Sequence, residues 1–263
     1  PGLVSHLVKA GIEYIANTQF KKDKELKKLI KENKFNEAAQ RLNIKMIHIN
    51  DIDLQKINDK YDDNKLFNTW CIDSFFFEAL SEATMNIGTQ EKIDFEDECK
   101  FIDYENGFIE FKKLAVEKEC DTYYPEGKFK GYLVPHEETI TIAKSLEVKK
   151  DNKVIYRPSV MFIYSPCEFA RKYLKNAKVN EYPNPDPNKP LDCENQNGET
   201  IIRGYVYPKY SEIVYKEKIE SGTEYVGVLI MGENFKPVWV GNRIELSYLY
   251  KNEKDSYWQT PTI

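Results

Sequence analysis

One aromatic segment combines two kinds of side chain that could act on a charged ligand. Between Leu66 and Leu80 the chain sets Trp70, Asp73 and Glu78 among apolar residues. If this segment is a helix, each residue turns by about 100°, which places Glu78 only about 80° round the axis from Trp70. The indole and the carboxylate can then face the same space, where a buried carboxylate needs a cation or hydrogen bonds to compensate it. The competing interpretation puts Trp70 in the core and Glu78 on the solvated side.

A second set of carboxylates follows a short buried strand predicted at residues 44–49. Asp51 and Asp53 come directly after this strand. Segments at strand ends carry function more often than the elements themselves, so Asp51 is a candidate site residue. Asp51 could equally be the N-cap of a helix predicted from Leu54 to Tyr61. The pattern leaves both interpretations open.

A histidine lies beside two further carboxylates. His136 comes just after a strand predicted at 129–134 and just before Glu137 and Glu138. A neighbouring carboxylate can fix the tautomer of an imidazole or raise its pKa. The competing interpretation is that the two glutamates stabilise the N-terminal turn of a short helix at 139–146.

The composition limits the classes of ligand and partner. The chain has 263 residues, of which 41% are hydrophobic and 13% aromatic, as in a globular protein. Its net charge is −5 and no basic block could follow a phosphate backbone, so we expect no nucleic acid partner. No apolar run approaches the length that spans a membrane. The five cysteines are scattered without a CxxC pair and there are three histidines, so we expect reduced thiols, a cytoplasmic protein and no metal site.

The order of predicted elements indicates an α+β domain. Helices are predicted at 1–16 and, as one or two solvated helices, at 21–41. Strands predominate afterwards, with a hairpin turn at Asn106-Gly107 and a loop-like stretch at 112–127. Residues 180–197 hold four of the twelve prolines and are expected to form a surface insertion. We therefore expect a mostly antiparallel or mixed sheet with helices on one face. The chain has no GxGxxG motif and no P-loop, so it lacks the usual dinucleotide fingerprint.

Five blocks of sequence, taken together and in order, resemble the bacterial homospermidine synthase family, which has the fold of saccharopine-dehydrogenase-like reductases. The blocks are Pro1–Ser5, Ile47–Asp53, Phe67–Glu78 with Gly88–Glu91, Gly131–Glu138, and Tyr156–Pro158 with Tyr164–Cys167. The resemblance implies that residues 1–263 form the substrate-binding and dimerisation domain of a homodimer. It also implies that a Rossmann NAD domain lies outside this segment, which is expected to be inactive alone.

The resemblance implies an amine-transfer reaction. Enzymes of this family use tightly held NAD to oxidise one putrescine to an imine by hydride transfer. A second amine adds, ammonia leaves, and the same hydride reduces the new imine to homospermidine. Such a site needs carboxylates that hold ammonium groups by charge-assisted hydrogen bonds. It also needs a group that stabilises a cationic iminium, and an indole face attracts a desolvated cation by about 2 kcal/mol.

The resemblance also assigns roles to individual residues. Trp70 would be the cation–π group, and His136 would be the active-site histidine. Asp51 falls where the family has an acidic residue that holds the far amine. The carboxylates that would bind the substrate are Glu78, Asp51, Asp73 and Glu138.

The chain departs from the family pattern at three positions, which leaves the preferred amine open. Glu137 stands where the family usually has asparagine, Gln90 stands where it has histidine, and Asp51 is one methylene shorter than the usual glutamate. One alternative is a saccharopine- or carboxyspermidine-type dehydrogenase, which would need an arginine for a substrate carboxylate, with Arg157 and Arg203 as candidates. Another is a non-catalytic polyamine-binding or dimerisation module.

Overall fold

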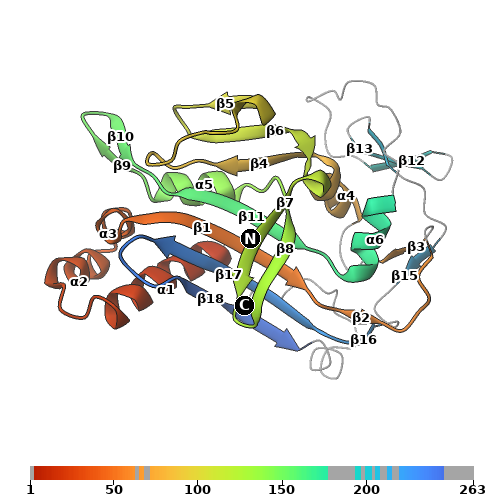
Figure 1. Cartoon of the computed structure of the whole chain (residues 1–263), viewed down its shortest axis with the longest axis horizontal. Helices are drawn as coiled ribbons and strands as arrows, with labels where there is room; N and C mark the ends of the chain where they lie inside the picture. The colour runs from red at the N-terminus through yellow and green to blue at the C-terminus, as the bar shows by residue number, and fades with distance from the viewer. Residues whose placement is uncertain are drawn as a thin grey trace.

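The computed structural model describes residues 3–62, 65–67, 72–176, 193–196, 199–202, 205–207, 212–214 and 219–245. Their centre is a mixed nine-stranded sheet, whose main strand order is β18-β17-β1-β11-β4-β6-β5 (Figure 1). These strands are β1 (Ile44–Asp53), β4 (Glu82–Asn86), β5 (Cys99–Asp103), β6 (Phe108–Leu114), β11 (Ser159–Ser165), β17 (Thr223–Gly232) and β18 (Val238–Glu245). The sheet is completed by the hairpin of β7 (Glu119–Tyr124) and β8 (Gly127–Leu133), because β8 pairs with the end of β11.

The described α-helices share one hydrophobic core with the sheet. The first three gather at one end of the molecule and α6 lies towards the other (Figure 1). Their bounds are α1 (Leu3–Thr18), α2 (Lys24–Lys31), α3 (Phe35–Leu42), α4 (Ile72–Leu80), α5 (Glu138–Ser145) and α6 (Glu168–Asn176). None of the described helices combines the length and the apolar composition needed to cross a bilayer.

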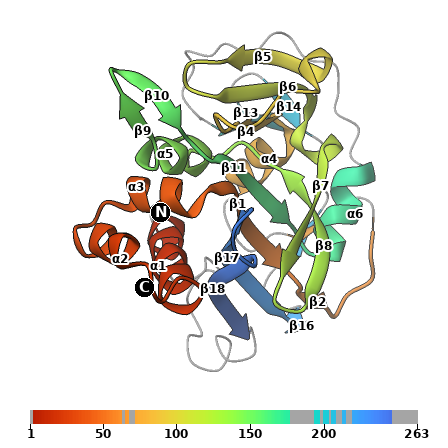
Figure 2. The same ribbon diagram turned by 60° about the vertical axis from the view of Figure 1, so that its left-hand side comes forward.

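The central strand β1 separates the two faces of the sheet. It pairs in parallel with β11 and antiparallel with β17. Ile47 and Ile49 belong to the core that the helices share. The alternating residues His48 and Asn50 face the other way, and both contact Thr122 of β7. The β7–β8 hairpin therefore covers part of the face opposite the helices (Figures 1 and 2). The predicted mixed sheet with helices is confirmed.

Local signals set the ends of the N-terminal helices. The region predicted as one or two helices at 21–41 forms two. Asp23 caps α2, because its side chain accepts the N–H of Leu26 at 2.9 Å. Asn43 ends α3 in the left-handed conformation, with φ of 53°. The helix predicted at 1–16 corresponds to α1.

The helix predicted from Leu54 to Tyr61 is wrong. Strand β1 continues to Asp53, and the N–H of Leu54 donates to the carbonyl of Thr223 at 2.9 Å. The short strand β2 (Lys56–Ile57) then pairs with β16 (Ile219–Ser221). Pairing with a distant segment keeps the backbone extended here, which outweighs the local helical pattern. Asp51 is consequently a strand residue and not a helix N-cap.

The stretch 112–127, predicted as loop-like, is mostly regular. It contains the end of β6, the 3₁₀ turn η2 (Ala115–Glu117) and all of β7. Thr122 is buried, because β7 packs over the sheet and not at its margin. The hairpin turn predicted at Asn106-Gly107 is confirmed between β5 and β6, where Gly107 has φ of +73°.

Smaller sheets and turns complete the described part of the chain. Most of the insertion predicted at 180–197 lies outside the described residues, and only one strand falls within it. The remaining elements are β3 (Lys65–Phe67) with β15 (Glu212–Val214), β9 (Val148–Lys150) with β10 (Lys153–Tyr156), the strands β12 (Cys193–Gln196), β13 (Glu199–Ile202) and β14 (Tyr205–Tyr207), and the 3₁₀ turn η1 (Glu96–Glu98).

Candidate functional site

Three of the predicted site residues meet on the helical face of the sheet. The chain leaves β8 with the N–H of Val134 bonded to the carbonyl of Phe162, at 3.1 Å. His136 then stacks on the Phe162 ring, with centroids 4.2 Å and planes 16° apart. Its Nδ1 contacts Oε2 of Glu138, and its Nε2 lies 4.0 Å from Oε1 of Glu78. The imidazole is thus held between carboxylates from two helices, α4 and α5.

Both predicted interpretations of Glu138 apply at once. It is the first residue of α5, where a carboxylate interacts favourably with the helix dipole. It also reaches back to His136, two residues earlier in the chain. Glu137, which precedes it, is exposed and makes no capping hydrogen bond with its side chain. The neighbouring glutamates therefore have different environments.

The three side chains influence one another's protonation. Burial alone would lower the pKa of His136, but the hydrogen bond and charge of Glu138, followed by the charge of Glu78, outweigh it and raise that pKa. Burial raises the pKa of Glu78 to about 7. Burial would also raise the pKa of Glu138, yet its bond to His136 lowers it. Near neutral pH, Glu78 can therefore hold or release a proton, and His136 keeps its proton to a higher pH than a free imidazole does.

Asp51 lies beside this group on β1. The β11 residue that pairs with Asp51 comes two positions after Phe162, so it points to the same face of the sheet as Phe162. Asp51 therefore lies on the face that carries His136, which stacks on Phe162. Burial, followed by the negative charges of Glu224, Asp53 and Glu78, raises the pKa of Asp51 well above its usual value. The structure thus places Asp51 close enough to Glu78 for the charge of Glu78 to raise the pKa of Asp51.

Two further carboxylates, which the sequence interpretation did not assign, extend this site. Asp53 of β1 stands directly opposite Glu224 of β17 in the strand register. Burial raises the pKa of Asp53 to about 7, and the charge of Glu224 adds to this effect. We call Asp51, Asp53, Glu78 and Glu224 the acidic cluster. The alternation Asp51-Ile52-Asp53 could have identified the first pair once the strand was known to reach Asp53, whereas Glu224 becomes a neighbour only through pairing with a distant strand.

The side chains of two predicted site residues, Trp70 and Asp73, lie outside the part of the chain that the structure describes. Trp70 is outside the described residues. Asp73 belongs to α4, but its side chain is also outside what the structure describes. The predicted approach of the indole to Glu78 therefore stays a prediction, while the helix that carries Glu78 is confirmed.

The arginine that the dehydrogenase alternative would need is already engaged in the fold. The Arg157 side chain is 3% exposed, and its Nη1 donates to Oε1 of Glu147 at 2.9 Å. It also donates to the carbonyls of Glu105 and Ile87, at 3.1 and 3.3 Å. These contacts make Arg157 a structural residue. Arg203, the other candidate, is outside the described residues.

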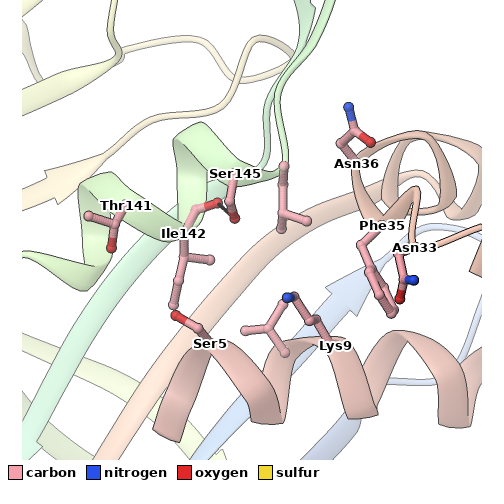
Figure 3. A pocket seen from close by; sticks show the side chains of 10 residues that line it. Ser5, Lys9, Asn33, Phe35, Asn36, Thr141, Ile142 and Ser145 are labelled. Atoms are coloured by element: carbon pink, nitrogen blue, oxygen red, sulfur yellow. Dashed lines mark hydrogen bonds between the residues drawn. The ribbon is translucent and has the colours of Figure 1, made fainter. Parts of the chain in front are cut away.

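A pocket of about 410 Å³ lies between α1, α3 and α5, away from the predicted site residues. Ser5 and Lys9 reach it from α1, and Thr141 and Ser145 from α5 (Figure 3). The described residues that line it include no carboxylate, so it does not suit a cationic ligand. Nor does any group of three or more His, Cys, Asp or Glu side chains in the described ranges have a metal-binding arrangement. The acidic cluster with His136 and Glu138 is therefore the candidate site.

Comparison with known proteins points to one group of enzymes. No family model matches the chain. It is 24% identical over 249 residues to homospermidine synthase of Mesorhizobium japonicum. The aligned region covers 94% of this chain and 46% of that protein. It is 30% identical over 135 residues to homospermidine synthase of Blastochloris viridis. This aligned region covers 50% of this chain and 28% of that protein. The resemblance to homospermidine synthases is confirmed by these similarities.

A solved structure supports the same fold. Homospermidine synthase of Legionella pneumophila, in complex with NAD, superposes with a TM-score of 0.72 at 23% identity. The match covers 95% of this chain and 49% of that one. The chain thus shares the fold of this part of the enzyme and spans less than half the length of each of the three proteins.

Proposed function

We propose that this chain is the substrate-binding and dimerisation domain of a cytoplasmic, homodimeric enzyme that makes homospermidine from putrescine. The observation that carries this proposal is His136, held between Glu78 and Glu138 beside the acidic cluster. Similarity to homospermidine synthases along most of the chain supports it.

The acidic cluster suits a substrate with positively charged amines. Asp51 and Asp53 keep some solvent accessibility, yet burial raises the pKa of each. Raised carboxyl pKa values mean that the ionised forms lack enough compensating charge in the unliganded protein. A bound ammonium supplies that charge and donates up to three hydrogen bonds. A diamine therefore fits this surface better than a neutral or carboxylated substrate.

The same charge argues against NAD phosphates at these residues. A cluster of carboxylates repels a pyrophosphate, and the sequence has no glycine fingerprint that would cradle one. We propose that NAD is bound mainly by residues outside this segment. When bound, NAD supplies the hydride acceptor for the substrate amine.

The residues of this chain would bind the amine and move its protons. Asp51 and Glu78 would hold and orient the ammonium groups. An amine must lose a proton before it attacks an imine, and the departing ammonia must gain one. Nε2 of His136, which faces Glu78, would carry out both transfers, while Glu138 at Nδ1 would fix the orientation of the ring. Trp70 would stabilise the iminium cation through its indole face.

Ammonia release from putrescine by the natural full-length protein tests this function. NAD is supplied well below the substrate concentration. Ammonia far in excess of the NAD present, without accumulation of NADH, is expected for the redox-neutral transfer. Accumulation of NADH in proportion to product would support a dehydrogenase instead. Putrescine binding without any turnover would leave a binding module.

A further inference from the structure

The pocket between α1, α3 and α5 is not used by the proposed function. Its volume of about 410 Å³ is within the range of sites that bind small molecules. Its buried apolar lining residues are Val8, Phe35, Ile142 and Leu146. The other residues that line it are polar: Ser5, Lys9, Asn33, Asn36, Thr141 and Ser145. The pocket thus combines apolar surface with a few polar groups, which is the usual composition of a small-molecule site.

Lys9 is the charged residue of this pocket. Its side chain extends from α1 towards the space between α5 and Phe35 (Figure 3). Its Nζ lies 5.7 Å from the centre of the Phe35 ring, and an aromatic face attracts a cation. Within the described ranges, no carboxylate lies at ion-pair distance from Lys9. The pocket therefore holds a positive charge that no carboxylate in the described part of the chain balances.

Two hydroxyl groups at the pocket are available to a ligand. Ser5 lies one helical turn before Lys9, so the two side chains are on the same face of α1. Thr141 reaches the pocket from α5 (Figure 3). Neither the Ser5 nor the Thr141 hydroxyl has a hydrogen-bond partner in the part of the chain that the structure describes. Each can therefore donate to an oxygen atom of a ligand, as the Lys9 ammonium can.

The helix ends at the pocket are compatible with a negative charge. Phe35 is the first residue of α3, whose N-cap Lys34 makes no side-chain capping bond, so the positive end of that helix lies here. Glu37 in the first turn of α3 pairs with Lys34 at 4.0 Å and does not line the pocket. At the other side, where α5 ends, the Ile142 carbonyl already accepts the Ser145 hydroxyl at 2.8 Å.

We propose that this pocket binds a small organic carboxylate with an apolar body. The carboxylate would accept a charge-assisted hydrogen bond from Lys9 and further hydrogen bonds from Ser5 and Thr141. Its apolar body would cover the Val8 and Ile142 side chains. One lysine balances one negative charge, so a monocarboxylate fits better than a phosphate group, which carries about −1.5 to −2. The ligand is opposite in charge to an amine substrate, so the inference does not depend on the proposed function.

Binding of 2-naphthoate and of 2-naphthamide tests this site. The two probes share one ring system, and only naphthoate carries a negative charge. Calorimetric titrations of the wild type at low ionic strength should show tighter binding of naphthoate. Lys9→Gln should lower the affinity for naphthoate by about tenfold and leave that for naphthamide nearly unchanged, because it removes a charge-assisted bond. Thr141→Val should lower the naphthoate affinity less, since it removes a neutral donor.

The variants are chosen to keep the fold. Lys9 and Thr141 are exposed residues, so the melting temperatures of both variants should stay close to that of the wild type. Lys27→Gln is the matched control, because Lys27 is an exposed lysine of α2 that does not line the pocket. It changes the net charge by the same amount and should leave both affinities unchanged.

The outcomes separate a carboxylate site from general attraction of the probe. A wild type that does not bind naphthoate, or binds both probes equally, would overturn the proposal. So would an unchanged naphthoate affinity in Lys9→Gln, or an equal loss in Lys9→Gln and Lys27→Gln. None of these results bears on ammonia release from putrescine, which tests the proposed function separately.

Discussion

Nε2 of His136 lies 4.0 Å from Oε1 of Glu78, although the two residues come from the segment after β8 and from helix α4. The distance exceeds that of a direct hydrogen bond. A substrate nitrogen that lies to one side of this pair, about 2.9 Å from each atom, would contact both at once. The other ring nitrogen is taken by Glu138, so Nε2 is the nitrogen available for exchange with a ligand.

Glu78→Gln should lower the catalytic efficiency of the enzyme with its amine substrate. The amide keeps the shape of the side chain but removes the negative charge that binds an ammonium and faces His136. We expect kcat/KM for putrescine to fall by about tenfold or more, the equivalent of one charge-assisted hydrogen bond. Glu82→Gln is the control, because Glu82 pairs with Lys100 at the start of β4 and should retain nearly full activity. Full activity in Glu78→Gln would exclude Glu78 from the site.

Glu138→Gln should destabilise the protein in a pH-dependent way. The folded-state pKa of His136 is raised. Its contribution to the stability of the fold is therefore complete below the unfolded-state pKa of about 6.5 and is lost as the pH rises through the folded-state pKa. The folded-state pKa of Glu138 is lowered. Its contribution to the stability of the fold is therefore present above about pH 4.3 and is lost as the pH falls through its folded-state pKa. The pair is therefore most stabilising between these limits.

Thermal unfolding of Glu138→Gln at two pH values measures this effect. We expect a melting temperature lower than that of the wild type by roughly 2–8 °C near pH 5.5, and a much smaller difference near pH 9. Glu137→Gln is the neighbouring control, and its exposed side chain should make little difference at either pH. A loss of the same size at both pH values would show that Glu138 acts through packing and not through His136.

Local signals in the sequence were sufficient where the partners are close in the chain. His136 and Glu138 are two residues apart, so their contact could be predicted before the fold was known. The Asn106-Gly107 turn was recognised because only a few residue types favour its backbone conformation. Asp51 was recognised as a candidate because it follows a buried strand.

Contacts that depend on distant pairing could not be predicted in this way. The length of β1, and with it the exclusion of a helix after Asp53, is set by its register with β17. Glu224 enters the acidic cluster through the same pairing. Glu78 meets His136 only because α4 and the segment after β8 pack on one face of the sheet. None of these relationships has a local pattern, since each is fixed by the three-dimensional arrangement.

Replacement of Trp70 tests the predicted cation–π contact directly. Trp70→Ala should lower kcat for putrescine by about thirtyfold, which corresponds to about 2 kcal/mol of iminium stabilisation. Trp70→Phe should retain part of the activity, since a phenyl face also attracts cations, though less strongly. Equal losses in the two variants would point to packing of the indole instead.

Putrescine binding should tighten as the pH rises through neutrality. Burial raises the pKa of Glu78 and of Asp53 to about 7, so both are largely protonated near pH 6 and ionised near pH 8. Calorimetric titrations at constant ionic strength should show an increase in affinity of about tenfold over this range. Because these pKa values are raised, the stability they contribute is present below about pH 4 and is lost as the pH rises through 7. The unliganded protein should therefore become less stable over the same range, and a flat affinity profile would contradict the assignment.

Arg157→Met should destabilise the fold without a specific effect on the amine. The substitution removes the buried partner of the Glu147 carboxylate, whose side chain is 8% exposed, and leaves it only the contact with the exposed Lys149 at 3.5 Å. Removing one member of a buried pair costs about 3–5 kcal/mol when the other charge is left unpaired, and chemical denaturation should show a loss of up to this size because Lys149 still offsets part of the Glu147 charge. Arg41→Met is the control, because Arg41 pairs with Asp23 at the surface, where such a contact contributes at most about 1 kcal/mol. The double substitution with Glu147→Leu should recover part of the stability, since no charge is then left buried. A variant that is as stable as the wild type but has lost activity would restore Arg157 as a substrate-binding residue and, with it, the dehydrogenase alternative.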